Sequence, residues 1–266
     1  MAKTSEPIFN VPGVILALIL GLAVVQGLRE WVLGEAGLLW DFALIPARFS
    51  HLLGSDPLRA LSERVAADPE NTMLLQRLAL ARELMLDNET KPWTLLTYAG
   101  LHGSWMHLIL NSIWLLAFGS AVARRFGTFR FLVFFAVTAL AGGVAHVLTH
   151  MDDVIPMVGA SAAVSGCMAA AIRFVFQPGA PLGVFRLGEE HAYCLPALPL
   201  GEVVRDRRVM SFLVVWFVMN LATGLAGSGL GITDATIAWE AHVGGFLAGL
   251  FGFPAFDPGS GAAQRG

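Results

Sequence analysis

Residues 131–148 read FLVFFAVTALAGGVAHVL, a stretch without a single Asp, Glu, Lys or Arg. About 20 apolar residues in a helix cross the hydrocarbon core of a bilayer. Backbone amides in lipid must pair within their own segment, so a helix is expected. The sequence therefore predicts an all-α polytopic membrane protein. Its six expected transmembrane helices are Val11–Leu28, Trp105–Val122, Phe129–Leu148, Val158–Phe176, Val209–Leu225 and Ile237–Phe253.

The composition agrees with this class of protein. Hydrophobic residues make up 56% of the chain and charged residues only 14%, against about 25% charged in soluble domains. The mean hydropathy is +0.66, and the lipid bilayer is the first expected partner. The chain has no basic stripe long enough for nucleic acid, which excludes that partner. The two cysteines have no zinc-binding spacing.

Arginine placement predicts the orientation. Arg124, Arg125 and Arg130 flank the second connection, and five arginines lie in or beside the fourth. The third connection, around Asp152, and the fifth, around Asp234, contain no Lys or Arg. Because cytoplasmic loops carry the excess of Lys and Arg, we expect a cytoplasmic N-terminus and three outer loops. The first apolar run is interpreted as a retained helix rather than a signal peptide.

The first outer loop is long, from about Arg29 to Leu101. Its stretch Asp56–Leu86 has helical periodicity, which predicts one or two amphipathic helices. We divide the chain into four parts: residues 1–28 with the first helix, 29–101 as the extracytoplasmic loop, 102–255 as the core of helices two to six, and 256–266 as a C-terminal tail.

Polar residues inside spanning segments need a reason, because lipid disfavours them. Four stand out: His107 and Asn111 in the second helix, Ser161 in the fourth and His242 in the sixth. In the predicted topology these three helices all begin at the outer face. The four residues therefore lie at one depth in one leaflet.

These residue types suit acyl-transfer chemistry. A serine hydroxyl becomes nucleophilic when a base, usually histidine, takes its proton. The oxyanion that forms needs preorganised hydrogen-bond donors. Small residues recur every four positions in the fourth helix (Ala162, Gly166, Ala170) and in the sixth (Ala241, Gly245, Gly249). Such faces let membrane helices approach closely, which would bring Ser161 to His242.

Three motifs resemble those of the rhomboid family. The first is Pro92-Trp93-Thr94-Leu95-Leu96-Thr97-Tyr98 with His102-Gly103-Ser104-Trp105-Met106-His107 and Asn111. The second, Gly159-Ala160-Ser161-Ala162, is similar to the GxSG nucleophile motif. The third, Ala241-His242-Val243-Gly244-Gly245, is similar to the AHxxG motif. They occur in the family's order and on the expected helices.

This resemblance implies intramembrane serine proteolysis without a cofactor or metal. Ser161 would be the nucleophile and His242 the general base. His107, Asn111 and the Ser161 N–H would form the oxyanion hole, with His102, Gly159 and Gly245 in support. The implied substrates are transmembrane segments of other proteins. The implied gate and cap are Phe212, Trp216 and Phe217 with the fifth loop, Gly227-Ser228-Gly229.

Four positions depart from the family pattern. Ala162 replaces a glycine, Thr94 an arginine, Ala123 a glutamate, and Ser165 an aromatic residue that often stacks on the catalytic histidine. The last departure predicts that His242 is held less firmly than in typical members. The sequence does not say whether these changes lower activity.

Several alternatives remain open. A serine in a membrane helix often bonds its own helix backbone, and a rhomboid-like protein can bind transmembrane clients without cleaving them. A transporter would need repeats and deep charges. His146 and His150 could share a metal, but no carboxylate lies at ligand spacing, so we expect no metal site. The absence of a transit peptide and the Ala, Gly and Leu content favour a bacterial inner membrane. The oligomeric state is not readable.

Overall fold

The computed structural model describes residues 11–87, 89–182, 192–226 and 238–259, and the regular elements in them are helical. Leu44 and Met157 form an isolated antiparallel bridge. The longer helices are α1 (Gly13–Leu28), α2 (Glu35–Phe42), α4 (Pro57–Ala67), α5 (Thr72–Asp87), α7 (Trp105–Trp114), α8 (Ser120–Phe126), α9 (Thr128–Thr149), α10 (Ser161–Ala171), α13 (Arg207–Ala226) and α14 (Trp239–Phe256). The short elements are α3 (Ser50–Leu53), α6 (Thr94–Thr97), α12 (Leu200–Val203), the π-helices η1 (Arg29–Leu33) and η4 (Leu115–Gly119), and the 3-10 turns η2 (Pro46–Phe49) and η3 (Tyr98–Gly100).

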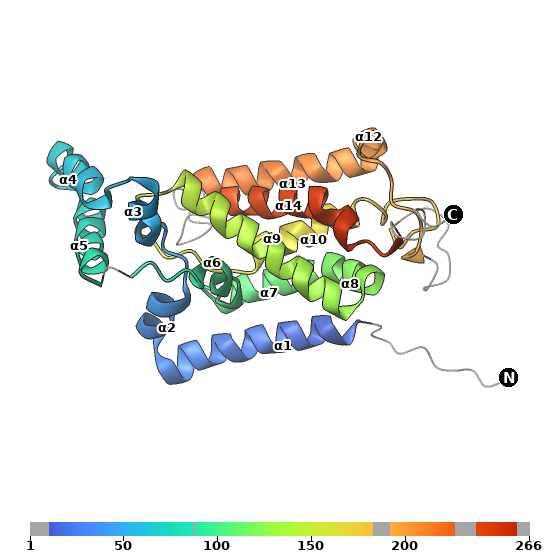
Figure 1. Cartoon of the computed structure of the whole chain (residues 1–266), viewed down its shortest axis with the longest axis horizontal. Coiled ribbons are helices and arrows are strands. Elements are labelled where there is room, and N and C mark those ends of the chain that lie inside the picture. Colours follow the sequence, from blue (N-terminus) through green and yellow to red (C-terminus); the bar gives the residue numbers. More distant parts are fainter. Residues whose placement is uncertain (1–10, 88, 183–191, 227–237, 260–266) are drawn as a thin grey trace.

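The long helices form one elongated bundle (Figure 1). Each of the six predicted runs coincides with a helix, and α7, η4 and α8 together form the second. Three segments are long and apolar enough to cross a membrane: Gly13–Leu33, Trp105–Phe126 and Thr128–Thr149. Among the described residues, the count of six membrane crossings therefore stays a prediction.

The fourth predicted run, Val158–Phe176, was too long. The helix begins only at Ser161 and ends at Ala171. Gly159 has a φ of +125°, a left-handed conformation that favours glycine, and its N–H donates to the Tyr98 carbonyl at 3.0 Å. The residues before Ser161 are therefore not helical, and those after Ala171 form turns. A helix enclosed by protein need not match the bilayer thickness.

Helix α10 is the centre of the bundle. Every residue from Ala162 to Ala171 is buried, and the helix packs mainly against α9 and α14. A Cβ on Gly245 would overlap the Ala162 carbonyl, and one on Gly249 would overlap Gly166. The backbones of α10 and α14 are thus in direct contact, as the four-residue spacing of small residues predicted.

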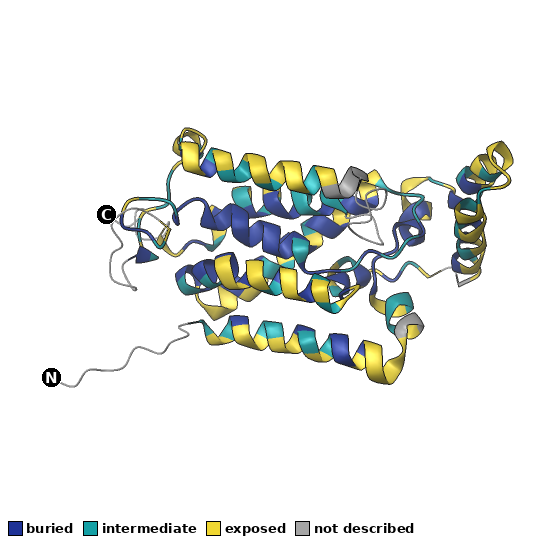
Figure 2. Ribbon diagram, turned by 180° about the vertical axis from the view of Figure 1, so that it is seen from behind, coloured by how far each residue is buried: buried dark blue, intermediate teal, exposed yellow. Residues whose placement is uncertain are grey.

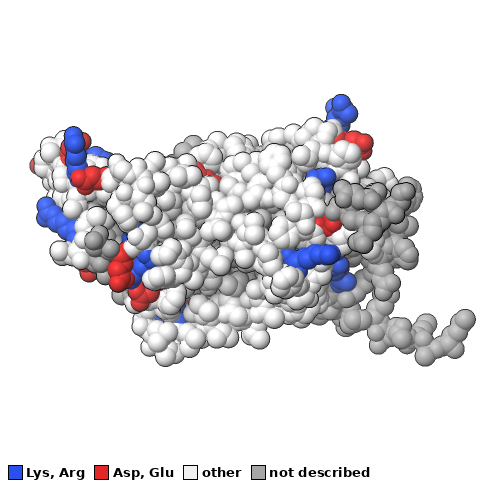
Figure 3. All heavy atoms as spheres, in the orientation of Figure 1, with Lys and Arg blue, Asp and Glu red and all other residues white. Residues whose placement is uncertain are grey.

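The outside of the bundle is apolar along its length. Exposed large hydrophobic side chains occur on α1, α7, α9, α13 and α14, and exposed residues dominate the outer face of α13 (Figure 2). Charged side chains gather toward the two ends of the face seen in Figure 3, leaving an uncharged band between them. A protein in water rarely exposes so continuous an apolar surface.

The stretch Asp56–Leu86 forms two helices, α4 and α5, where the sequence predicted one or two. The Asp56 carboxylate accepts from the Arg59 N–H and caps α4. Leu61, Leu78 and Leu84 pack with Val154, which follows α9. The pair stands at the end of the bundle opposite α8 (Figure 1).

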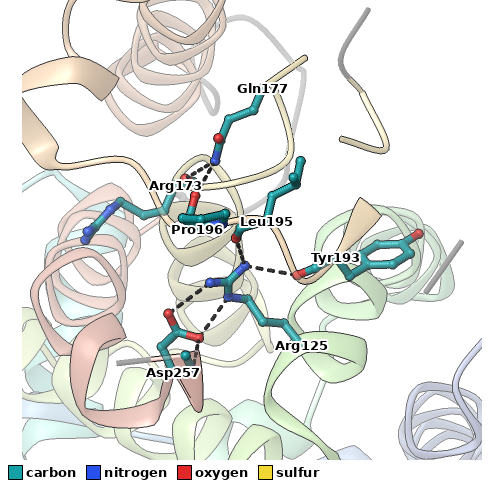
Figure 4. A network of polar contacts seen from close by, with 8 residues as sticks. Arg125, Arg173, Gln177, Tyr193, Leu195, Pro196 and Asp257 are labelled. Carbon is teal, nitrogen blue, oxygen red and sulfur yellow. Dashed lines mark hydrogen bonds and ion pairs between the residues drawn. The ribbon is translucent and has the colours of Figure 1, made fainter. Parts of the chain in front are cut away.

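At the α8 end, one arginine is enclosed by acceptors (Figure 4). Arg125 makes a bidentate pair with Asp257, at 2.9 and 3.0 Å. It also donates to the Tyr193 and Leu195 carbonyls. Nearby, Arg173 donates to the Leu198 carbonyl at 2.6 Å. This network ties the residues after α10 and α14 to α8.

Candidate active site

The two residues predicted to be catalytic meet at the other end of the bundle. Ser161 is the first residue of α10, and His242 lies in the first turn of α14. The His242 Nε2 and Ser161 Oγ atoms are 2.7 Å apart. This hydrogen bond joins a hydroxyl to the nitrogen that would take its proton, which is the geometry required of a nucleophile and its base.

A third residue, Asn220 of α13, completes the chain of contacts. Its Nδ2 donates to the Trp216 carbonyl at 2.7 Å, so its Oδ1 faces the His242 Nδ1, with which it forms a short hydrogen bond. An amide oxygen can only accept, so Nδ1 must carry the proton. The lone pair of His242 then lies on Nε2, facing Ser161, as a general base requires.

Asn220 was not among the residues singled out from the sequence. The available signal was its type, because it is a polar residue within the predicted fifth span. The same position compensates for Ser165, which lies where an aromatic residue was expected. The Ser165 Oγ donates to the Ser161 carbonyl at 2.8 Å within its own helix. The side chain that bonds the His242 Nδ1 is therefore Asn220.

Close packing of α10 and α14 sets the distance between Ser161 and His242. Gly245 is nearly one turn after His242, and its α-carbon lies against the Ala162 carbonyl. Any side chain at position 245 would separate the two backbones at this point. Gly245 therefore permits the close spacing of α10 and α14 beside the site.

His107 and Gly159 border the space beside the Ser161 hydroxyl. A Cβ built on Gly159 would lie 2.8 Å from the His107 Nε2 and 3.7 Å from the Ser161 Oγ. The His107 ring therefore lies in space that any side chain at position 159 would need, close to the Ser161 hydroxyl. The Ser161 N–H belongs to the first turn of α10, where amides have no partner within the helix. Both donors border a place where a substrate oxygen could sit.

Asn111 lies one turn after His107 on the same face of α7. It is buried, with 5% of its surface exposed. One of its amide hydrogens bonds the His107 carbonyl at 3.1 Å, and the amide group has a second hydrogen to donate. The residue is therefore held in place and keeps one donor.

His102 is fully buried beside His107, and their rings meet edge to face with centroids 5.1 Å apart. Neither ring nitrogen of His102 has a hydrogen-bond partner among the described residues. The loop that carries it is held from α1's end, where the Arg29 guanidinium donates to the Gly103 carbonyl at 3.1 Å. The structure thus places His102 by packing, and its supporting role, which the resemblance implied to be that of a hydrogen-bonding residue, stays a prediction.

The residues expected to form a gate lie on α13. Phe212 packs against Phe118 and Phe176, and Trp216 stacks on Phe246 of α14 with centroids 5.0 Å apart. Phe217 is exposed on the outer face. The fifth loop, with Gly227-Ser228-Gly229, lies outside the described residues.

A group of possible metal ligands lies near this site. The sequence suggested no carboxylate partner for His146 and His150, but the structure brings Glu240 of α14 to them. Linear spacing could not reveal this neighbour because α9 and α14 are nearly a hundred positions apart in the chain. The group contains none of the residues that contact Ser161.

Comparison with known proteins gives one family match and several relatives. The family model described as Rhomboid domain matches residues 89–255. The chain is 27% identical over 213 residues to RHOMBOID-like protein 5 of Arabidopsis thaliana, covering 77% of this chain and 58% of that protein. It is 26% identical over 171 residues to the rhomboid protease GluP of Bacillus subtilis, covering 64% and 27%. It is 28% identical over 159 residues to the rhomboid protease GlpG of Yersinia pseudotuberculosis, covering 59% and 46%.

The chain thus spans less than two thirds of the length of each of these relatives. The matched region includes every residue of the candidate site. Together with the three helices that are able to cross a membrane, the match identifies an integral membrane protein.

Proposed function

The chain belongs to the rhomboid family, and on that premise we propose that it is an intramembrane serine protease. It hydrolyses peptide bonds in or near transmembrane segments of other membrane proteins. The observation that carries the proposal is the 2.7 Å hydrogen bond between the Ser161 Oγ and the His242 Nε2. Two relatives named as rhomboid proteases support it.

In the proposed reaction, the Ser161 oxygen attacks the peptide carbonyl carbon while its proton moves to the His242 Nε2. The tetrahedral intermediate collapses when His242 gives this proton to the leaving amine, which leaves an acyl group on Ser161. A water molecule then attacks the ester, with His242 again taking and returning a proton. Asn220 holds the Nδ1–H throughout and keeps the ring in the reactive tautomer.

The negative oxygen of the intermediate is stabilised by donors beside the Ser161 hydroxyl and Gly159. We assign these donors to the Ser161 N–H, the His107 ring and the free amide hydrogen of Asn111. Donors fixed in advance are effective because they need no reorganisation as charge develops. The helix dipole at the start of α10 adds to this stabilisation.

The substrate is a transmembrane segment that enters from the lipid. α13 carries the proposed gate, because its outer face is apolar and exposed. In this proposal the chain crosses the bilayer six times with its N-terminus in the cytoplasm, and Arg124, Arg125 and Arg130 lie on the cytoplasmic side. The division into residues 1–28, 29–101, 102–255 and 256–266 and the bacterial inner membrane stay predictions.

A fluorophosphonate probe tests the proposal, because it reacts with activated serines. Purified full-length protein in detergent is labelled as wild type, Ser161→Ala, His242→Ala and Ser165→Ala. Ser165 is the matched control, since it lies one turn later on α10 and bonds only within that helix. We expect labelling of wild type and Ser165→Ala, and none of the other two variants. Cleavage of a model transmembrane substrate should fall at least ~10⁴-fold in both.

An unlabelled but folded wild type would overturn the protease proposal. The alternative would then be a non-catalytic rhomboid-like protein that binds transmembrane clients. Co-purification of the model substrate with an uncleaving wild type would support that alternative. Equal labelling of wild type and Ser161→Ala would instead remove Ser161 from the role of nucleophile.

A further inference from the structure

Three potential metal ligands meet where α9 ends and α14 begins. His146 lies in the last turn of α9, His150 is the residue that caps its C-terminal end, and Glu240 lies in the first turn of α14. One ligand atom from each residue lies within 4.8 Å of the other two. The imidazole rings are stacked, with centroids 4.7 Å apart. Two helices that are distant in sequence thus contribute to a single cluster.

The His146 Nδ1 atom lacks a partner in this cluster. The residue is 6% exposed, and this nitrogen has no hydrogen bond to the described part of the chain. A buried polar nitrogen without a partner is unfavourable by about 1–3 kcal/mol. A group that binds a lone pair would remove this penalty.

The His150 Nε2 atom also presents a lone pair to the cluster. The Thr149 hydroxyl directs its hydrogen to the Ala145 and His146 carbonyls, so its oxygen accepts from the His150 Nδ1 at 2.9 Å. Nδ1 therefore carries the proton of the neutral ring, and the lone pair lies on Nε2. That lone pair faces the Glu240 carboxylate at 3.6 Å, and two such acceptors need a cation, an added proton or a water molecule between them.

Solvent has a route to the cluster. His150 lines an open cavity of about 350 Å³ between the turn after α9 and the pair α4–α5. Asp152 and Asp153 also line it, together with Arg64 and Arg77. An ion can therefore reach His150 through this cavity, which is not lined by Ser161.

We propose that His146, His150 and Glu240 bind a Zn²⁺ ion. Two imidazoles and one carboxylate form a usual protein zinc set with a fourth position left for water. Ligand atoms about 2.1 Å from a tetrahedral Zn²⁺ lie about 3.4 Å apart, close to the 3.6 Å between His150 and Glu240. The larger separations in the cluster close by rotation of the side chains. Thr149 is then the partner that orients a ligand from behind.

Zinc at this position ties the end of α9 to the start of α14. Glu240 is two residues before His242, so the ion fixes the part of α14 that carries the proposed base. The site uses no group from the Ser161–His242 pair, so its existence does not depend on the proteolytic function. We expect the ion to stabilise the fold rather than to take part in bond cleavage.

Zinc binding is measured by isothermal titration on full-length protein in detergent, purified without a histidine tag and stripped with EDTA. The variants are His150→Gln and Glu240→Gln, which change partly exposed groups, and the control is His51→Gln on α3. We expect one Zn²⁺ per wild-type chain and a higher thermal midpoint when it is bound. Affinity should fall about tenfold or more in both cluster variants and stay unchanged in the control.

Two further arms separate this site from other ligands. His107→Gln should bind Zn²⁺ as wild type does, whereas a loss there would place the ion at the Ser161 site instead. Mg²⁺ should give no heat, because it prefers oxygen ligands. Absence of Zn²⁺ binding to folded wild type, or equal affinity in all variants, would overturn the proposal and leave a His150–Glu240 ion pair.

Discussion

Polar side chains gather at two opposite ends of the bundle, and the two ends differ in how completely their donors and acceptors are hydrogen-bonded. At one end Arg125 uses its donors on Asp257 and two carbonyls, and its guanidinium also lies over the Phe174 and Phe253 rings. At the other end, groups around Ser161 and His146 keep donors or lone pairs that no partner in the described part of the chain satisfies. Satisfied polar groups stabilise a fold, whereas unsatisfied ones are kept for a ligand or a transition state.

Breaking the Arg125 end should cost the most stability. Arg125→Met leaves the Asp257 carboxylate buried without its cation, because the side chains of the pair are only 5% and 7% exposed. Loss of one partner of such a pair destabilises by about 3–5 kcal/mol. Unfolding of the variant in detergent, followed by heat or by denaturant, should show this loss. Probe labelling of the molecules that remain folded should match wild type.

Arg208→Met is the control for that variant, since Arg208 pairs with Asp206 at 3.3 Å on the surface. It should change stability by less than about 1 kcal/mol. The double variant Arg125→Met with Asp257→Leu should regain part of the loss, because no charge is left buried. Similar effects of Arg125→Met and Arg208→Met would mean that the network is not structural.

Substitutions at the Ser161 end should lower the rate of substrate cleavage rather than the stability of the fold. Asn111→Ala removes one proposed oxyanion donor, so substrate cleavage should slow by ~10²-fold. The neighbouring Ser112→Ala is the control, because its Oγ bonds only the Leu108 carbonyl of the same helix. Single-turnover kinetics on a transmembrane substrate measure both. An unchanged rate for Asn111→Ala would remove Asn111 from the site.

The close contact between α10 and α14 runs between the two ends of the bundle. Adding one methyl group at Gly245 tests its importance. Gly245→Ala places a Cβ against the Ala162 carbonyl, so α14 must move away from α10. We expect a loss of about 1–3 kcal/mol, typical of overpacking, and weaker labelling of Ser161. Gly252→Ala on the same helix is the control, since a Cβ there meets no atom within 4 Å. Equal behaviour of the two variants would contradict the role of close packing.

Much of this architecture could be predicted from the sequence. The apolar runs gave the positions of the long helices, because a bilayer permits few other structures. The charges in the connections predicted one bilayer depth for Ser161, His107 and His242, and this depth stays a prediction. The ends of α10 could not be predicted, because they depend on the conformation of Gly159 and on tertiary contacts after Ala171.

The site residues that could not be predicted from the sequence are those whose role depends on which helices pack together. Glu240 was seen beside His242, but its place next to His146 and His150 needed the packing of α14 on α9. Asn220 was not predicted for a similar reason, since its contact with His242 depends on the packing of α13 against α14. The sequence did show that Asn220 is a polar residue in an apolar segment, and that observation could have singled it out.

Asn220 gives the smallest expected effect and the sharpest test of how the site is held. Asn220→Leu keeps the approximate volume but removes the acceptor for the His242 Nδ1–H, so the ring is free to turn or change tautomer. Cleavage should slow by about tenfold through kcat, with KM unchanged, because no substrate contact is lost. Asn220→Asp keeps an acceptor and should retain more activity than Asn220→Leu. Equal losses in both variants, or a change confined to KM, would mean that α13 contributes to substrate binding rather than to the orientation of His242. Because Asn220 lies on α13, the helix that carries the proposed gate, a tenfold loss in kcat would mean that the base is correctly aligned only while α13 rests against α14.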